Sequence, residues 1–310
     1  MHFKKIAIAA VLLALASVPL LAGGHLRYIA TLWMIYAIAA VGLQIPIGLA
    51  AVYSFGHSVF MLLGAYAVGL CVLHAPGLQV PLGLVLGIVL SVAVAMLLAL
   101  PSLRLSSFGL AIVTMGAASL FFQGVRSFDF TGGPQGLNVP PVPLVQAWGG
   151  RAFYLLSVLL LVLGCVVARC VERGRIGRGL RAAAANPLMA QSFGVHLLGS
   201  RTLAFALSAV YGAISGGLLG LSTGYIAPEA YSPELSIQIF AAVMIGGSGR
   251  YWGPILGALF IVLIPEVTQS VQNVGPIIYS VLFIAVATLY PGGLQQMISH
   301  LLQPRGRAAT

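Results

Sequence analysis

The sequence predicts an all-α, polytopic transmembrane helical bundle of about ten spans, some of them short or broken. Hydrophobic residues make up 60% of the 310 positions, 6% are charged, and the mean hydropathy is +1.04. A soluble domain carries about 25% charged residues. Several apolar runs reach the ~20 residues that a helix needs to cross a bilayer. In lipid the backbone N–H and C=O groups of such runs must be hydrogen-bonded within the protein, and a helix is the usual way to achieve this. The runs are therefore expected to be helices.

The apolar runs form one transmembrane domain over residues 1–310. Basic residues accumulate in cytoplasmic loops, so placing Lys4 and Lys5 inside makes odd spans run outward and even spans inward. Twelve of the fifteen basic residues then lie inside, which predicts a bacterial inner-membrane protein with both termini in the cytoplasm. A cleaved signal peptide is the alternative for the first run. The expected segments are 6–22, 27–48, 58–74, 81–100, 108–124, 152–171, 201–221, 236–247, 254–271 and 276–290.

Charge and motif content exclude several functional classes. The net charge of +10 reports loop orientation in a membrane protein and does not indicate a nucleic-acid partner. Cys71, Cys165 and Cys170 lack metal-ligand spacing and are interpreted as packing residues. The chain has no P-loop, no zinc-protease motif and no serine-hydrolase motif. We therefore expect no catalytic residue, no metal and no cofactor in this chain.

Two interruptions of the apolar pattern are candidates for a transport path. One separates the second and third segments, and the other follows the run 236–247, which at about 12 residues is too short to span alone. Irregular backbone at membrane depth needs cover from protein or a water-filled cavity, and paired interruptions mark the binding site in many transporters. Glycines that permit close packing, and a structural hydrogen bond from the histidine to freed carbonyls, are the alternatives. The candidates, with the one clearly intramembrane acid, are Ser54, Gly56, His57, Gly246, Gly247, Gly249 and Glu266.

The predicted external surface centres on a loop at about residues 125–150. Its Gly- and Pro-rich sequence is typical of turns, and it suits either a lid or docking surface or an ordinary ordered loop. Asp129, Glu229 and Glu234 also face outside in this topology. These acids are expected either to meet basic residues of an external partner or to be solvated.

A basic insert, "GRIGRGLRAAAANPLMAQSFGV" at residues 174–195, lies on the predicted cytoplasmic side. Six of the thirteen arginines fall between positions 169 and 201. A first short helix is expected over Gly177–Ala185, with Arg178 and Arg181 on one side. A second begins at Pro187.

The second short helix carries start and stop signals. Asn186 can cap a helix that begins with Pro187, and Gly194 can end it in a left-handed conformation. This arrangement exposes Leu188 and other apolar residues. Anchoring of arginines by anionic headgroups accounts for the charge but not for the capped helix, whereas docking of a cytosolic partner accounts for both.

Several motifs together resemble the branched-chain amino-acid ABC importer permeases of the LivM-like type. They occur in order over about residues 30–294. The matching strings are GRGLRA (177–182), NPL (186–188), FGV (193–195), SFGHSVF (54–60), GAY (64–66), LAIVT (110–114), TGG (131–133), GGSG (246–249), WGP (252–254) and YPGGL (290–294).

The resemblance implies a division of labour among several partners. In this family a periplasmic binding protein delivers the solute, and a second permease chain, here LivH-like, completes the path. Two cytosolic ATPase subunits use ATP and Mg and act through a coupling loop, here about residues 172–200. The permease itself sits in membrane lipid and is not an enzyme. The residues expected at the ATPase interface are Arg178, Arg181, Asn186, Pro187, Leu188 and Gly194.

The resemblance is compatible with more than one docking chemistry and more than one substrate. Ala184 and Ala185 stand where the family commonly has a basic–acidic pair. Branched-chain amino acids, urea or short amides, and aromatic acids are all compatible with the resemblance. The alternative class is a secondary transporter or channel for a small polar solute, and a proton-driven transporter would need chains of intramembrane acids or histidines.

Overall fold

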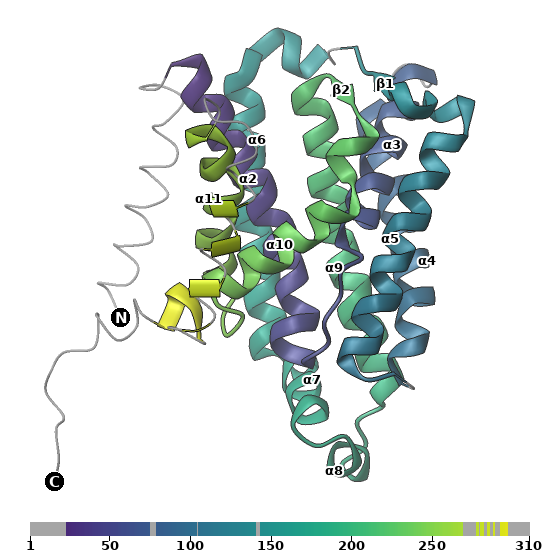
Figure 1. The fold of residues 1–310 in the computed structure, drawn as a ribbon, viewed down its shortest axis with the longest axis vertical. Helices are drawn as coiled ribbons and strands as arrows, with labels where there is room; N and C mark the ends of the chain where they lie inside the picture. Colours follow the sequence, from purple (N-terminus) through teal and green to yellow (C-terminus); the bar gives the residue numbers. More distant parts are fainter. Residues whose placement is uncertain are drawn as a thin grey trace, which may run out of the picture.

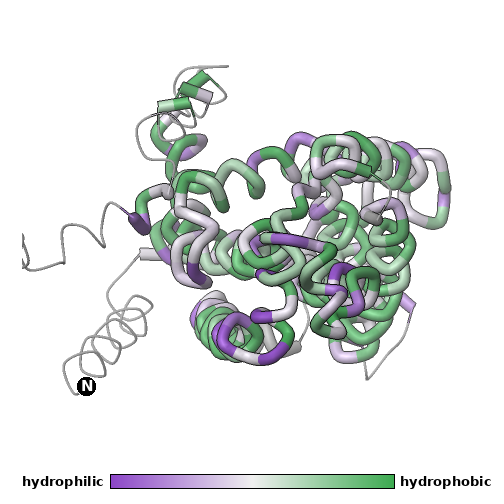
Figure 2. The backbone as a smooth tube through the Cα atoms, turned by 90° about the horizontal axis from the view of Figure 1, so that it is seen from below, coloured by the Kyte–Doolittle hydropathy of each residue, from purple (hydrophilic) through white to green (hydrophobic). Residues whose placement is uncertain are grey.

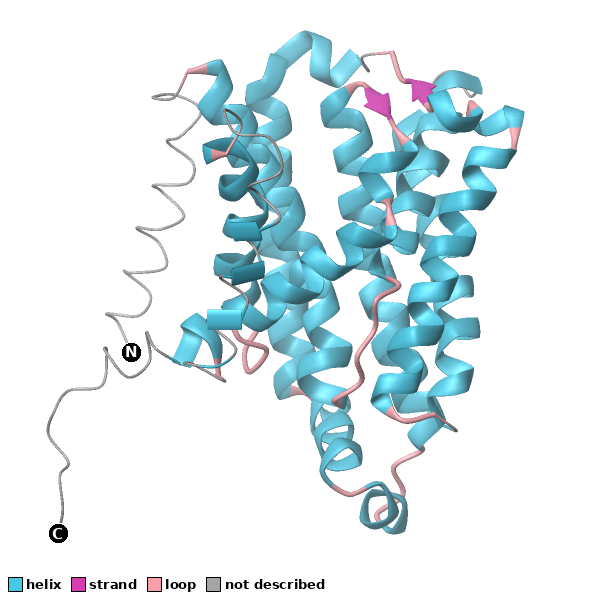
Figure 3. Ribbon diagram, viewed as in Figure 1, coloured by secondary structure: helices cyan, strands magenta, loops and turns pink. Residues whose placement is uncertain are grey.

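The protein is almost entirely helical (Figure 3). The computed structural model describes residues 23–74, 79–103, 105–140 and 143–268, with short stretches between 277 and 296. Within these residues six helices are long and apolar enough to cross a membrane. The long helices are α2 (Gly24–Gln44), α3 (His57–His74), α4 (Gln79–Ala99), α5 (Ser107–Ser127), α6 (Pro143–Arg173) and α9 (Leu197–Thr223). The shorter helices are α7 (Arg175–Ala185), α8 (Pro187–Ser192), α10 (Pro233–Gly246) and α11 (Gly253–Val267).

The all-α polytopic prediction is confirmed. Eight of the ten expected segments correspond to α2, α3, α4, α5, α6, α9, α10 and α11. The segment 6–22 and its signal-peptide alternative lie outside the described residues, and 276–290 lies partly outside them. Successive long helices run in opposite directions, with α7 and α8 at one end of the bundle and β1 and β2 at the other (Figure 1). From the end that carries α7 and α8, the helices are largely hydrophobic and the hydrophilic positions fall mostly in loops and helix ends (Figure 2).

Helix α4 packs through its small residues and exposes its large ones. A Cβ atom on Gly83 would lie 2.6 Å from the Cα of Val68, and one on Gly87 would lie 2.9 Å from the Cα of Gly64. Small residues of this kind let helix backbones approach closely in membranes. Along the inner face they are Gly83, Gly87, Ser91, Ala95 and Ala99. The exposed face includes Val85, Leu86, Val89, Leu90 and Leu97.

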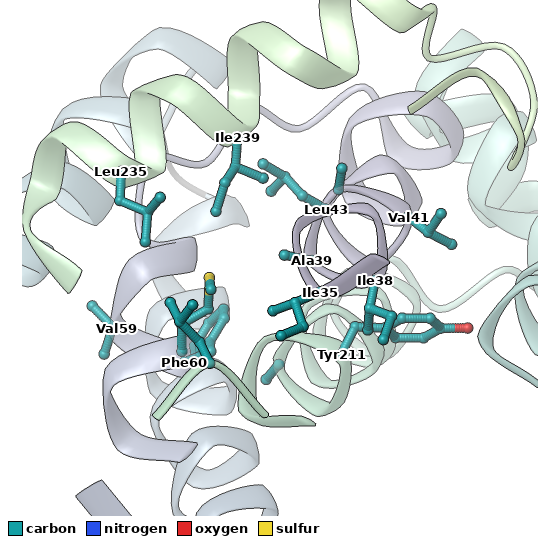
Figure 4. Packing of buried hydrophobic residues seen from close by; sticks show 14 of the residues in the cluster. Ile35, Ile38, Ala39, Val41, Leu43, Val59, Phe60, Tyr211, Leu235 and Ile239 are labelled. Atoms are coloured by element: carbon teal, nitrogen blue, oxygen red, sulfur yellow. The ribbon is translucent and has the colours of Figure 1, made fainter. Parts of the chain in front are cut away.

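The same packing brings α3 and α9 together at the centre of the bundle. A Cβ on Gly64 would overlap the backbone of Ala213, and one on Gly216 would overlap the carbonyl of Met61. Helices α3, α9 and α2 carry the longest runs of buried residues. Around this contact, side chains from α2, α3 and α10 converge (Figure 4).

A two-stranded sheet closes the end opposite α7 and α8. β1 (Leu137–Asn138) pairs antiparallel with β2 (Tyr225–Ile226), so that Leu137 faces Ile226. The expected loop at 125–150 is shorter than predicted, because α5 continues to Ser127 and α6 already begins at Pro143. Proline is favoured in the first turn of a helix because its missing N–H has no intrahelical partner there.

The close α3–α9 contact predicts opposite effects of one substitution at two helical glycines. Gly216→Ala should destabilise the fold by about 1–3 kcal/mol through overpacking, because the added methyl meets the Met61 backbone. Gly116→Ala is the matched control, since nothing lies within 4 Å of its Cβ position and alanine gains up to about 1 kcal/mol in helix propensity. Thermal unfolding in detergent measures both. Equal melting temperatures for the two variants would contradict the packing argument.

Candidate functional site

The basic insert folds into two short helices at the lower end of the bundle (Figure 1). The predicted helix starting at Pro187 is confirmed as α8. The side-chain Oδ1 of Asn186 accepts a hydrogen bond from the backbone N–H of Met189 at 3.1 Å. This bond satisfies one of the free donors at the helix start.

The end of α8 is also as predicted. Gly194 has φ +80°, in the left-handed region where glycine is favoured. The N–H of Val195 bonds the carbonyl of Ala190 at 3.0 Å, and the N–H of Gly194 bonds that of Gln191 at 2.9 Å. These two bonds form a Schellman motif, which satisfies carbonyls that a frayed end would leave open. Helix α8 is therefore fixed at both ends despite its length of six residues.

Helix α7 is attached to the end of α6. Nη1 of Arg178 donates to the carbonyl of Arg173 at 2.9 Å, and Arg181 donates to the carbonyl of Glu172. Arginines suit these carbonyls because the last turn of a helix carries unpaired acceptors and a partial negative charge. Gly177 makes the contact possible, since a Cβ there would overlap the carbonyl of Val171. Both arginines thus orient the insert on the bundle while lying at its exposed surface.

An apolar surface remains uncovered on this insert. The exposed fractions are 77% for Leu188, 60% for Met189 and 82% for Phe193. An open hollow of about 520 Å³ lies where the insert joins α9, lined by Gln191 and residues 194–198. Large apolar side chains exposed together commonly mark an interaction site.

The predicted break before α3 is an unwound segment within the bundle. Helix α2 widens into a π-type turn over Ile45–Leu49, which contains Pro46. The chain then leaves the helical conformation through residues 51–56, with Ala51 at a φ of +51°, until α3 begins at His57. A proline without an N–H disrupts the regular α-helical ladder.

Polar groups from other helices satisfy this unwound backbone. The N–H of Phe55 donates to Oγ1 of Thr114 at 2.9 Å, and Oγ of Ser107 donates to the carbonyl of Ala51 at 3.0 Å. Ser54, itself buried, accepts from the N–H of Gly56 at 3.3 Å. Protein groups therefore satisfy several backbone groups of this segment, as its position requires.

His57 is fully buried in the first turn of α3. Its Nδ1 lies 3.2 Å from Oγ of Ser208 on α9. The prediction that His57 bonds a freed backbone carbonyl is therefore wrong for Nδ1, because the partner of Nδ1 is the hydroxyl of Ser208. Its Nε2 has no hydrogen-bond partner among the described residues.

The first turns of α3 and α10 meet through two serines. The N–H of Ser58 donates to Oγ of Ser236, and that hydroxyl donates to Oγ of Ser58, both at 2.8 Å. All three groups are buried, so these bonds replace solvation that the site lacks. They join segments 178 positions apart in the sequence.

The second predicted break, after α10, lies lower in the bundle. Gly246 and Gly247 end the helix, and Gly247 has φ +100°. The carbonyl of Ser248 accepts from Nε2 of Gln44 at 3.1 Å. Gly249 lies exposed in the following turn. The two breaks therefore meet at the foot of α2, whereas His57 lies deeper, against α9.

The predicted acids occupy three different places. Glu266 lies 2.7 Å from Nε2 of His25, near the beginning of α2, and so is not brought together with the other path candidates. Asp129 is exposed just after α5. Glu229 lies 3.8 Å from Nε of Arg126 in the same region. Glu234 lies exposed in the first turn of α10.

Sequence reasoning missed the hydroxyl and amide residues that hold the breaks together. They are uncharged side chains inside apolar runs, so they do not stand out as ionisable residues do. Their isolated polar character in segments otherwise suited to lipid is the feature that could have indicated them. These residues are Gln44, Thr114, Ser208 and Ser236.

The fold and the site define a multi-pass membrane protein with a broken-helix core and a structured loop at one end. Over residues 25–289 the chain matches the permease component of the branched-chain amino acid transport system. The chain belongs to this family of transport permeases. Membership favours a permease of an ABC system over a secondary transporter or channel.

Individual relatives show the range of the family. The chain is 27% identical to the high-affinity branched-chain amino acid transport system permease protein LivM of Escherichia coli, over 99% of this chain and 78% of that protein. It is 30% identical to the probable branched-chain amino acid transport permease protein LivH of Methanocaldococcus jannaschii over 43% of each. It is 28% identical to the autoinducer 2 import system permease protein LsrC of Escherichia coli, over 76% of this chain and 71% of that protein. No solved structure gives a match.

The caps of α8 predict a local effect of removing Asn186. Asn186→Ala should cost about 1 kcal/mol of helix stability, which corresponds to about a fivefold increase in opening. Hydrogen–deuterium exchange of the peptide containing residues 187–193 measures this opening. Gln191→Ala, at an exposed position within the same helix, should leave exchange nearly unchanged. Identical exchange in the two variants would show that the cap does not stabilise α8.

Proposed function

We propose that this chain is the membrane-spanning permease subunit of an ATP-driven ABC importer for branched-chain amino acids, delivered by a periplasmic binding protein. The observation that carries the proposal is the capped, apolar insert at the end of a bundle of this family. The substrate class is supported by the LivM relative, which matches 99% of the chain, whereas LsrC matches 76%. Urea, short amides and aromatic acids are the other substrates to test.

The proposed assembly contains a second, LivH-like permease chain and two cytosolic ATPase subunits. Similarity to both LivM and LivH proteins supports a permease pair. ATP and Mg act in the ATPase subunits, and this chain binds no cofactor and performs no catalysis. The assembly resides in the bacterial inner membrane, surrounded by lipid, with both termini and the insert in the cytoplasm.

In this proposal the insert is the coupling loop that receives the motion of the ATPases. Leu188, Met189 and Phe193 form the apolar contact, because they are exposed on a helix fixed at both ends. Asn186, Pro187 and Gly194 set its shape. Arg178 and Arg181 hold α7 to α6, so a push on the loop moves the bundle instead of bending the loop.

A second connection carries that motion to α4. Helix α9 begins directly after the loop, and Arg201 in its second turn donates to the carbonyl of Ser102, just beyond the end of α4. Helix α9 also bears the Ser208 contact to His57. Displacement of the loop is therefore passed through α9 toward the unwound segment.

The opposite end of the bundle is the proposed docking surface for the binding protein. Asp129 and Glu229 lie exposed beside the β1–β2 sheet, where they can meet basic residues of a docking protein. Charge pairs at such a rim act mainly on the association rate. Glu234 belongs to a different part of the molecule, because it lies in the first turn of α10 and not at this end of the bundle.

The apolar surface of α8 predicts loss of ATPase association when it is made acidic. Leu188→Asp combined with Phe193→Asp should abolish co-purification of the ATPase, because central apolar contacts dominate such interfaces. The control is Gln191→Asp, an exposed change on the same helix. Equal ATPase recovery from the double mutant and the control would overturn the docking assignment.

The arginine contacts to α6 predict uncoupling when their charge is reversed. Arg178→Glu with Arg181→Glu places acids against the partly negative end of α6. Uptake of leucine into proteoliposomes should fall at least about tenfold, since two charge-assisted bonds are lost. ATP hydrolysis and membrane insertion should persist. Wild-type uptake in this variant would remove the coupling role of these arginines.

A further inference from the structure

One carboxylate of the described residues lies exposed halfway along the bundle. Glu234 sits in the first turn of α10 and its side chain is not covered by the rest of the chain. Helix α10 crosses the bundle obliquely at about half its height (Figure 1). The position of this acid therefore needs an explanation different from that of the acids at the rim.

Contacts of α10 fix this depth independently. Ser236, two positions after Glu234, bonds Ser58 in the first turn of α3. Just before that turn, the N–H of Phe55 donates to Thr114, which lies in the middle part of α5. The turn also lies beside Gly212, near the middle of α9, whose Cβ position is 3.4 Å from His57. The start of α10 is thus at mid-depth of helices that span the membrane.

The two faces of α10 differ in character. Leu235 and Ile239 point inward toward side chains of α2 and α3 (Figure 4). The opposite face exposes Glu234, Ile237 and Gln238. A carboxylate and an amide on the outward face, beside Ile237, are not the pattern expected for a helix that lipid surrounds.

Lipid is excluded as the medium around this face. A carboxylate at the bilayer centre is costly, and such residues face a bundle interior or a water-filled cavity. Helix α4 provides the contrast, because the side chains along its exposed face, such as Leu86, Leu90 and Leu97, are apolar. The face of α10 is therefore turned toward water or another protein chain, whereas α4 is turned toward lipid.

The exposed face of α10 combines the charge of Glu234 with apolar surface further along the helix. Ile237 is 40% exposed on the same face. Tyr53, in the unwound segment, is also 40% exposed, and its ring stacks edge-on against Phe240 of α10 at 5.9 Å between ring centres. Such a surface suits a solute with one cationic group and one apolar group.

We propose that this face of α10 lines the substrate path and that Glu234 receives the ammonium group of the amino acid as it passes, while Ile237 and Tyr53 contact its apolar side chain. The inference rests on the proposed import function and adds a specific contact to it. A carboxylate binds an ammonium group through a charge-assisted hydrogen bond, and its exposure on this face allows the group to be released.

Transport by the reconstituted complex tests the contact. Glu234→Gln should lower ATP-driven leucine uptake about tenfold or more, while Glu234→Asp keeps most of it. The matched control is Glu266→Gln, which also exchanges a carboxylate for an amide but lies against His25, away from this face. Co-purification of both permease chains and the ATPases should be unchanged in all variants.

The outcomes separate this contact from other roles. Normal uptake by Glu234→Gln overturns the proposal. Loss of uptake together with loss of the second permease chain also overturns it, because Glu234 would then serve the interface between the chains. Absence of ATP-driven leucine uptake in the wild type refutes the proposed function instead. The labelling of Glu234→Cys described next then decides whether this face lines a water-filled path.

Chemical accessibility tests the path without reference to the substrate. In a variant lacking Cys71, Cys165 and Cys170, Glu234→Cys should react with a membrane-impermeant thiol reagent in the assembled permease. Leu90→Cys, on the exposed face of α4, should stay unreactive because lipid covers it. An unreactive Glu234→Cys overturns the assignment of this face to a water-filled path.

Discussion

Peptide groups that leave a helix at membrane depth must find partners within the protein, and much of this structure follows from that constraint. Residues 51–56 have lost their helical hydrogen bonds. Their cover comes from Thr114 and Ser107 on α5, while α10 seals the start of α3 through Ser236. These partners determine where α5 and α10 lie. As a result α3 and α10 both begin at mid-depth of the bundle, which helices that span the membrane without a break do not do.

Close approach of backbones makes room for that arrangement. Where α3, α4 and α9 meet, glycine, alanine and serine replace large side chains, so the unwound segment is held by rigid neighbours. Because lipid provides no hydrophobic force between helices, packing and hydrogen bonds hold such a bundle together. The bundle therefore has two kinds of exposed surface. The large apolar side chains of α4 suit contact with lipid, whereas the exposed carboxylate and amide of α10 do not.

Local rules predicted the parts of the structure that depend on neighbouring residues. Asn186, Pro187 and Gly194 act within one short helix, so their roles could be inferred from spacing alone. Apolar run lengths gave the spans for the same reason. The pairing of Ser58 with Ser236, the oblique course of α10 and the β1–β2 sheet depend on residues far apart in sequence, and no local pattern encodes them. Arg178 and Arg181 show both cases, because their shared side was predictable but their attachment to α6 was not.

The cover of the unwound segment has a consequence for biosynthesis. A nascent chain emerges from its N-terminus, so residues 51–56 enter the membrane long before their later partners exist. Ser236 is made 178 residues after Ser58, and Ser248 follows Gln44 by 204 residues. Until α10 arrives, the start of α3 lacks its hydroxyl partner from Ser236. Maturation of the core is therefore a late, C-terminal event, even though the residues that require it lie in the first fifth of the chain.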